Sequence, residues 1–185
     1  MQIYGDHHTF RNMRFGIART MLFLFGENNL IENCEFYDCY VSTIYVQSDR
    51  NSIVGNTFRA RTGTVNTDPS ISARNGFGRI ENNFFEAGSN QVGEIIALSG
   101  HDYAVRNNSF KDLKNNAITF SGSNTIFEGN QFNFFDNKYK YYGILGSNLD
   151  AEQGNVVYDD NIFCNGLSLT NMPVAEKNSK AISEK

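Results

Sequence analysis

Short runs of alternating apolar and polar residues fill this chain, and one six-residue pattern within them recurs seven times. The pattern is an aliphatic or aromatic residue, a polar bend rich in asparagine and a closing phenylalanine, as in residues 105–110, Val-Arg-Asn-Asn-Ser-Phe. The closing Phe falls at positions 15, 36, 58, 85, 110, 132 and 163, in steps of 21 to 31 residues. An internal repeat of this period predicts one supersecondary unit stacked on copies of itself.

A second apolar pattern precedes each copy of this motif, in two columns that lie two residues apart. One column holds Ile3, Leu24, Val46, Ala73, Leu98, Phe120 and Ile144. The other holds Leu22, Ile44, Ile71, Ile96, Ile118 and Tyr142. A spacing of two indicates a strand with one buried face. Each unit is therefore expected to contain three short strands: one in these columns, one that carries the aliphatic residue of the motif, and one that carries its phenylalanine.

A three-strand unit of this length predicts an all-β fold, a right-handed parallel β-helix of about seven to eight coils. Like residues would then stand about 4.8 Å apart along the axis. A leucine-rich repeat has a similar period, but its Leu-x-x-Leu-x-Leu frame is missing from this sequence. We expect one β-helix domain over residues 1–171, alone or as a module of a longer chain, and a polar tail or short cap over 172–185. Residues 1–5 enter directly as a strand, so the open first coil is expected to accept an upstream domain or a second subunit.

The residues that repeat are expected to form the scaffold rather than a site. The phenylalanines would stack ring on ring inside the coil. Five asparagines at one place in the bend are expected to form a ladder of side-chain amides, in which each amide donates to one neighbour and accepts from the other. They are Asn56, Asn83, Asn108, Asn130 and Asn161. Asparagine in a bend also tolerates a left-handed backbone. At Met13 and Cys34 the ladder position holds another residue, and a different packing is expected there.

Composition and charge exclude several classes of binding partner for this chain. The 185 residues have a net charge of −4 with scattered Lys and Arg, which argues against nucleic acid because phosphate binding needs a concentrated basic face. No apolar run approaches the roughly 18 residues of a membrane span, and the first five residues do not resemble a signal peptide. Cys34, Cys39 and Cys164 lie in no metal-ligand spacing. The sequence therefore predicts no nucleic acid partner, no membrane span, no metal site and no cofactor.

The Asn-Asn-x-Phe repeat over residues 2 to about 171 resembles the pectate-lyase-like β-helix superfamily. This resemblance implies binding or cleavage of polysaccharides, and it favours an extracellular, virion or cell-surface location. Residues 93–96 (Gly-Glu-Ile-Ile) with 106–110 are also similar to chondroitinase B and alginate lyases. The Lys and the Arg-His of that family do not occur at the matching positions, 97–100 and 119–121. Asn-Thr-Asp at 66–68 and Asp159-Asp160 match polygalacturonases only as short strings.

In a repeat protein, function is expected at the loops that make a coil longer than the minimum length. Four longer loops, at residues 59–69, 86–93, 134–141 and 147–154, flank the first strand of their coils and could wall a groove over coils four to seven. Asp68, Glu94 and Lys140 enter that sheet at nearly equivalent positions and are the candidate catalytic group, with His101 as a candidate acid or base. Stacking would place Asp68 and Glu94 about 5–9 Å apart, a separation that glycosidases use. The alternative is that these are solvated side chains at a loop edge.

Aromatic side chains on the outward face of the first three coils are a further functional signal. Tyr4, Phe23, Phe25 and Tyr45 occupy positions where a monomer would place polar groups. Saccharide, another subunit or domain, or a covering loop would each bury these rings. Arg74 is the charged residue in the middle of the sheet and could bind a uronate carboxylate.

Two functions therefore remain open from the sequence. One is a β-helix that binds or processes polysaccharide, as a hydrolase or lyase, in the groove over the first sheet. The other is a non-catalytic spike, shaft or surface module that oligomerises through its aromatic face.

Overall fold

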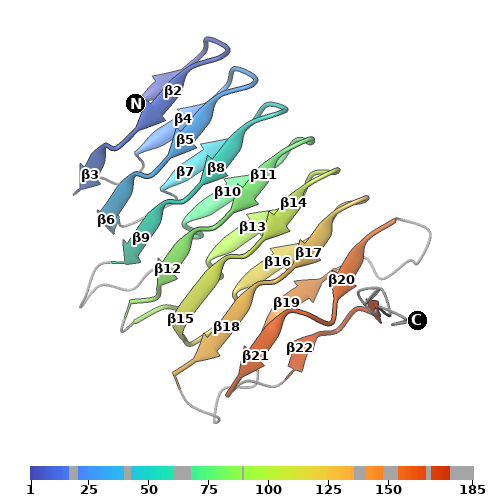
Figure 1. Ribbon diagram of the computed structural model, residues 1–185. Helices are drawn as coiled ribbons and strands as arrows, with labels where there is room; N and C mark the ends of the chain where they lie inside the picture. The colour runs from blue at the N-terminus through green and yellow to red at the C-terminus, as the bar shows by residue number, and fades with distance from the viewer. Residues whose placement is uncertain are drawn as a thin grey trace, which may run out of the picture.

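The structure, a computed structural model, describes residues 1–16, 21–39, 43–60, 68–88, 90–135, 141–147, 154–165 and 168–175, with the side chain of Cys39 left aside. All regular structure in these ranges is short β-strand. Each turn of the chain contributes one strand to each of three parallel sheets, and successive coils lie one upon the next from the N-terminus to the C-terminus (Figure 1). The predicted all-β parallel β-helix is confirmed.

The three sheets contain eight, eight and seven strands within the described residues. The first sheet is β1 (Gln2–Ile3), β4 (Leu22–Leu24), β7 (Ile44–Val46), β10 (Ile71–Ala73), β13 (Ile96–Leu98), β16 (Ile118–Phe120), β19 (Tyr142–Gly146) and β22 (Ser168–Thr170). The second is β2 (Thr9–Arg11), β5 (Leu30–Glu32), β8 (Ser52–Val54), β11 (Arg79–Glu81), β14 (Ala104–Arg106), β17 (Ile126–Glu128), β20 (Val156–Tyr158) and β23 (Val174–Ala175). The third is β3 (Arg14–Gly16), β6 (Glu35–Cys39), β9 (Thr57–Ala60), β12 (Phe84–Glu86), β15 (Ser109–Leu113), β18 (Gln131–Phe134) and β21 (Ile162–Cys164).

The register places equivalent residues of successive coils opposite one another, so that each apolar column becomes a buried row. Ile71, for example, pairs with Ile44 on one side and Ile96 on the other, and all three are fully buried. Between them the alternate residue of each strand faces outward, as the spacing of two predicts.

The seventh coil departs from the register expected from the sequence. Ile144 pairs with Ile118, and Gly146 pairs with Phe120. The placement of Ile144 opposite Phe120 is therefore wrong by two residues. Strand β19 runs to Gly146, so this glycine ends a strand that is longer than its counterparts rather than forming the turn after a three-residue strand.

A stack of phenylalanine rings fills one side of the interior. Ring centroids of Phe15, Phe36, Phe58, Phe85, Phe110 and Phe132 are separated by 4.7 to 5.0 Å with nearly parallel planes. Each stacked pair contributes about 0.5–1.5 kcal/mol beyond the burial of its rings. Phe163 pairs with Phe132 through the backbone, but its half-buried ring tilts by 56° against Phe134, 5.5 Å away. The expected stack of seven rings therefore contains six.

The asparagine ladder is present with all five expected members. Nδ2 of Asn56, Asn83, Asn108 and Asn130 donates to Oδ1 of the next asparagine over 2.9 to 3.1 Å. The other Nδ2 hydrogen bond goes to a backbone carbonyl of the preceding coil, and each Oδ1 also accepts a backbone N–H, as Asn108 does from Asn83. These amides are buried and satisfied, which is the condition for a polar row inside a protein.

Cys34 occupies the ladder position one coil before Asn56. Its backbone N–H donates to Oδ1 of Asn56 over 2.8 Å, and its Sγ lies 3.5 Å from the carbonyl oxygen of Phe10, where an asparagine would place Nδ2. The left-handed backbone falls on the residue before the ladder, at Asn33, Gly55, Asn82 and Asn107, with φ of 52° to 68°. The paired asparagines of the motif thus have separate tasks: the first makes the bend and the second makes the ladder.

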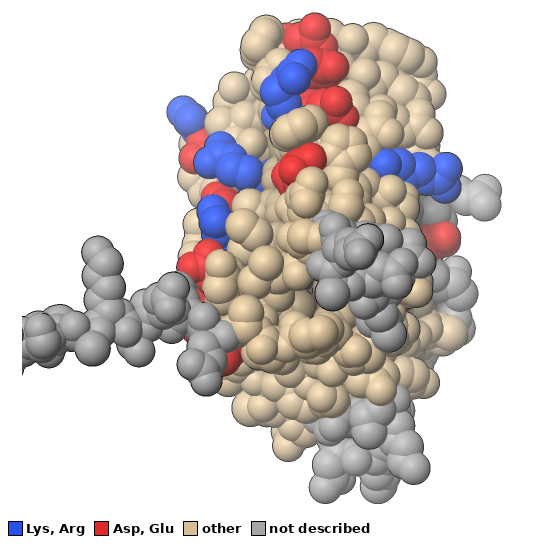
Figure 2. Space-filling model, turned by 90° about the vertical axis from the view of Figure 1, so that its right-hand side faces the viewer, with Lys and Arg blue, Asp and Glu red and all other residues tan. Residues whose placement is uncertain are grey.

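Charged side chains outside the third sheet alternate in sign along the axis. Glu35 pairs with Arg14 at 3.0 Å and Arg59 at 3.7 Å, and Glu86 pairs with Arg59 at 2.9 Å and Lys111 at 3.0 Å. The pKa of Glu86 is lowered, mainly by the hydrogen bond from Lys111. Figure 2 shows, on one face, basic side chains beside acidic ones and a broad area without either.

Regular structure continues past the expected domain boundary at residue 171. Met172 is buried, and Val174 and Ala175 pair with β20. The remainder of the expected tail or cap, residues 176–185, lies outside the described residues.

Candidate binding groove

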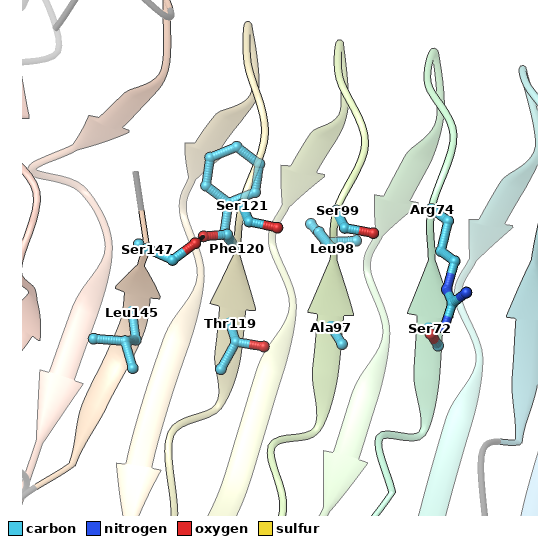
Figure 3. A pocket seen from close by; sticks show the side chains of 11 residues that line it. Ser72, Arg74, Ala97, Leu98, Ser99, Thr119, Phe120, Ser121, Leu145 and Ser147 are labelled. Carbon is cyan, nitrogen blue, oxygen red and sulfur yellow. Dashed lines mark hydrogen bonds between the residues drawn. The ribbon is translucent and has the colours of Figure 1, made fainter. Parts of the chain in front are cut away.

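A groove of about 560 Å³ crosses the outer face of the first sheet over β10, β13, β16 and β19 (Figure 3). It is lined by Ser72, Arg74, Ala97, Leu98, Ser99, Thr119, Phe120, Ser121, Leu145, Gly146 and Ser147. The sequence predicted a groove in coils four to seven, and the groove lies there.

The register produces the groove because it aligns small outward side chains. Ser72, Ala97, Thr119 and Leu145 form one row across the four strands. Arg74, Ser99, Ser121 and Ser147 follow one position beyond the strand and form a second row, as Figure 3 shows. Coils one to three carry large rings at the same places, so the sheet face falls from a raised aromatic end to a hollowed end.

The groove offers neutral hydrogen-bonding groups and one charge. Among the described residues that line it, Arg74 is the only charged side chain, and five others are serine or threonine. Hydroxyl groups both donate and accept hydrogen bonds, whereas the guanidinium only donates and is suited to a planar carboxylate. This chemistry matches a ligand with many hydroxyl groups and an occasional acidic group.

The four outward aromatic residues form one continuous patch at the raised end. The ring of Tyr4, 69% exposed, stacks on Phe25 at 4.8 Å. Phe23 lies 6.2 Å from Phe25 and 5.7 Å from Tyr45. Arg74 then places its guanidinium carbon 5.2 Å from the centroid of the Tyr45 ring. This patch of four rings, the aromatic patch, therefore meets the groove at Arg74.

Asp68, Glu94 and His101 are not among the described residues that line the groove. Asp68 is exposed and Glu94 is half-buried, each shortly before a strand of the groove, β10 and β13 respectively. Lys140 lies outside the described residues, as do large parts of the loops at 59–69, 134–141 and 147–154. A catalytic role for Asp68, Glu94 and Lys140, and the separation of the two carboxylates, stay predictions.

His101 lies in the turn between β13 and β14, beside a second hollow of about 420 Å³. Its Nδ1 is 2.6 Å from Oδ2 of Asp102. This hollow shares Arg74 and Ser99 with the groove. His101 is therefore placed next to the groove rather than in it.

The sequence singled out Arg74 and the four rings but assigned no site role to the serine and threonine residues of the groove. The alternation within the first-sheet strands places Ser72, Ser99, Thr119 and Ser121 on the outward face, yet a hydroxyl on a strand surface is too common to mark a site. Ser147 was expected in an inserted loop, and the longer strand β19 brings it into the second row.

No cluster of three or more His, Cys, Asp or Glu suited to a metal ion occurs among the residues that the structure describes. Burial raises the pKa of the Cys34 thiol, and burial also raises the pKa of the Tyr103 hydroxyl. Within the same ranges, no helix is both long and apolar enough to cross a lipid bilayer.

Comparison with known proteins agrees with this architecture. Residues 2–172 match the family model described as "Right handed beta helix region". A similar solved structure is that of PfbA, a surface adhesin of Streptococcus pneumoniae, with a TM-score of 0.59 and 16% sequence identity. The similarity covers 93% of this chain and 46% of the adhesin chain, so this chain spans about half of that protein. No curated protein matches the sequence.

Proposed function

We propose that this chain, which belongs to the right-handed β-helix family, binds a polysaccharide along the outer face of its first sheet. The observation that carries the proposal is the continuity of the aromatic patch, Arg74 and the hydroxyl-lined groove on one sheet. Seven coils at about 4.8 Å each give this track a length of roughly 30 Å, enough for an extended chain of several sugar rings.

Each part of the track suits a different feature of such a chain. Sugar rings have an apolar C–H face that stacks on exposed aromatic rings, while their hydroxyl groups exchange hydrogen bonds with serine and threonine. Arg74 at the junction suits the carboxylate of an acidic sugar, because a guanidinium binds a carboxylate through two parallel hydrogen bonds. A polysaccharide with acidic units is therefore the preferred ligand class.

Cleavage of the bound chain is the second candidate function. It rests on Asp68 and Glu94, which precede β10 and β13, two strands that line the groove. With Lys140 or His101 as a further acid or base, they would serve a hydrolase or lyase. No carboxylate is among the groove's described lining residues, and binding without cleavage is the simpler reading of this surface.

The third candidate function is that of a non-catalytic interface. The exposed ring of Tyr4 favours it, since a second subunit or an upstream domain would also cover the aromatic patch. The similar fold belongs to a surface adhesin, and a location on a surface or outside the cell is part of this proposal.

Binding to a panel of neutral and acidic polysaccharides, measured by affinity electrophoresis, tests the main proposal. Tyr45→Ser is expected to weaken binding, because it removes the ring that both Phe23 and Arg74 contact. Phe135→Ser is the matched control, since Phe135 is 59% exposed and follows the third sheet. Equal binding by the wild type and Tyr45→Ser would contradict the proposal.

The same panel separates the other two functions. Ultraviolet absorbance detects the unsaturated product of a lyase, and a reducing-end assay detects the product of a hydrolase. Loss of either product in Asp68→Asn or Glu94→Gln, with binding retained, would establish cleavage. Light scattering reports the mass in solution, and a dimer that Tyr45→Ser dissociates would favour the interface.

A further inference from the structure

The turn between the first and second sheets carries an exposed aromatic residue in a backbone conformation that does not suit it. Phe77 has φ of 55° and is 53% exposed. The equivalent left-handed position in the other described coils holds His, Asn, Arg, Asp or Gly. A bulky residue is a true outlier in this region of backbone space, and such outliers gather at functional sites. Burial in the core does not account for Phe77, because half of its surface faces solvent.

Phe77 contacts His101 of the next coil, and three features fix that histidine. Its ring meets the Phe77 ring edge-on with centroids 5.3 Å apart. Its Nδ1 lies 2.6 Å from Oδ2 of Asp102. Gly76 leaves the space that the imidazole occupies, since a Cβ on Gly76 would lie 2.4 Å from Cε1 of His101. A side chain held by a carboxylate, a ring and a glycine is pre-positioned to present its remaining atoms to a ligand.

The contact with Asp102 also decides which nitrogen of the neutral His101 imidazole can accept a hydrogen bond. An ionised carboxylate only accepts hydrogen bonds, so Nδ1–H of His101 donates to it. Nε2 is then the acceptor, ready for a hydroxyl donor. The hollow beside His101, about 420 Å³, also contains Asp49, whose Oδ1 accepts the backbone N–H of Gly76 over 2.9 Å.

This hollow adjoins the groove, because Arg74 and Ser99 line both. We propose that this hollow, which His101 lines, is a side arm of the binding site for a sugar branch that leaves the main chain at Arg74, and that the ring of Phe77, in contact with His101, flanks it. Nε2 of His101 accepts a hydrogen bond from a hydroxyl of the branch, and the exposed ring of Phe77 packs against its C–H face. This inference rests on the proposed function and adds to it a preference for branched polysaccharides.

Matched pairs of linear and branched polysaccharides test the side arm. Homogalacturonan with xylogalacturonan provides an acidic pair, and mannan with galactomannan provides a neutral pair. We expect the wild type to bind the branched member of at least one pair more tightly than the linear member. Phe77→Asn and His101→Ala are each expected to reduce the affinity for that branched member about 10-fold, the effect of one lost contact, and to leave the linear member unchanged.

Phe77→Asn is chosen because asparagine holds this position in two other coils, at Asn28 and Asn124, and suits the left-handed backbone. The variant should therefore melt no lower than the wild type. Phe135→Asn, which alters a similarly exposed ring after β18, is the control and should bind both members as the wild type does.

A nitrogen NMR spectrum of the histidine rings supplies a readout that a structural role would not move. The His101 Nε2 resonance is expected to shift on addition of the branched polysaccharide and not of the linear one. If the two variants lost affinity equally for the branched and the linear polysaccharide, or lost affinity for neither, the side-arm proposal would be overturned while the proposal of a binding groove would stand. Absence of wild-type binding to all four polysaccharides would overturn the proposed function and this inference with it.

Discussion

The guanidinium carbon of Arg74 lies 5.2 Å from the centroid of the Tyr45 ring, one coil away along the first sheet. This contact joins the aromatic patch to the groove and holds Arg74, the one charged side chain among the groove's described lining residues, at their boundary. A cation over an aromatic face is stabilised by the ring quadrupole, by about 0.5–1 kcal/mol at an exposed site. Arg74 is exposed, so its guanidinium group can still contact a ligand.

Replacement of Arg74 should therefore weaken binding of acidic polysaccharides selectively. Arg74→Ala removes a charge-assisted pair worth about 1.5–3 kcal/mol, which corresponds to roughly 10- to 100-fold in affinity. The affinity for neutral polysaccharides should fall much less. Arg79→Ala, at an exposed arginine of the second sheet, is the matched control. Calorimetric titration with polygalacturonate and with mannan measures both, and an equal loss for the two ligands would contradict the role assigned to Arg74.

The two asparagines of one motif should respond very differently to substitution. Asn108→Ala removes the acceptor of two hydrogen bonds from Asn83 and the donor to Asn130, all inside the coil. Leaving buried polar groups unpaired costs about 1–3 kcal/mol each, so we expect a loss of at least about 2 kcal/mol in the free energy of unfolding.

Asn107→Gly is the control for Asn108→Ala, because Asn107 has φ of 53° and glycine already occupies the equivalent position at Gly55 and Gly129. A change below about 0.5 kcal/mol is expected. Urea unfolding measures both variants. Similar losses at the two positions would refute the division of tasks within the motif.

Two glycines in turns between the first and second sheets should differ in the stability lost on substitution by alanine. A Cβ on Gly122 would lie 1.7 Å from the carbonyl oxygen of Gly100, and the backbone there cannot yield without parting two coils. Gly122→Ala is expected to cost about 1–3 kcal/mol or more. The nearest atoms to a Cβ on Gly76 belong to the imidazole of His101 rather than to backbone, so in Gly76→Ala that side chain can shift at the expense of its contacts with Phe77 and Asp102, and the cost should be smaller. Thermal unfolding compares them, and a larger loss in Gly76→Ala would count against this account.

The ion pair between Glu86 and Lys111 should contribute to stability only within a defined pH window. The pKa of Glu86 is lowered from 4.5, mainly by the hydrogen bond from Lys111, so its contribution is present above pH 4.5 and is lost as the pH falls through the lowered value. The pKa of Lys111 is raised from 10.5, mainly by the hydrogen bond to Glu86, so its contribution is present below pH 10.5 and is lost above the raised value.

Lys111→Met should therefore reduce the free energy of unfolding at pH 7 but not at pH 2. Both side chains are partly exposed, so the loss at pH 7 should be small and should shrink further in about 1 M salt. Chemical unfolding at the two pH values gives the comparison. A loss of the same size at pH 2 would show that packing of the lysine stem, rather than charge, is responsible.

The repeated motif allowed most of the scaffold to be predicted. The spacing of two identified the inward columns, and the position of Asn108 and its equivalents identified the amide ladder, because these features follow from the local pattern within one coil. The outward position of Arg74 and of the four rings followed from the same alternation. The register of the seventh coil did not, since Gly146 gives a turn signal in the sequence, whereas the pairing of Ile144 with Ile118 places this glycine in the strand, opposite Phe120.

The sequence by itself determined the coil, the three sheets, the inward columns and the ladder, because a side chain's direction in a short strand depends on its neighbours in the chain. The tertiary structure decided which side chains touch across coils: Arg74 on Tyr45, Phe163 on Phe134, and His101 between Phe77 and Asp102. Apart from the bond between His101 and Asp102, these contacts join residues of different strands or turns. They depend on backbone pairing over more than twenty residues and on the space that each side chain finds, which no local pattern specifies.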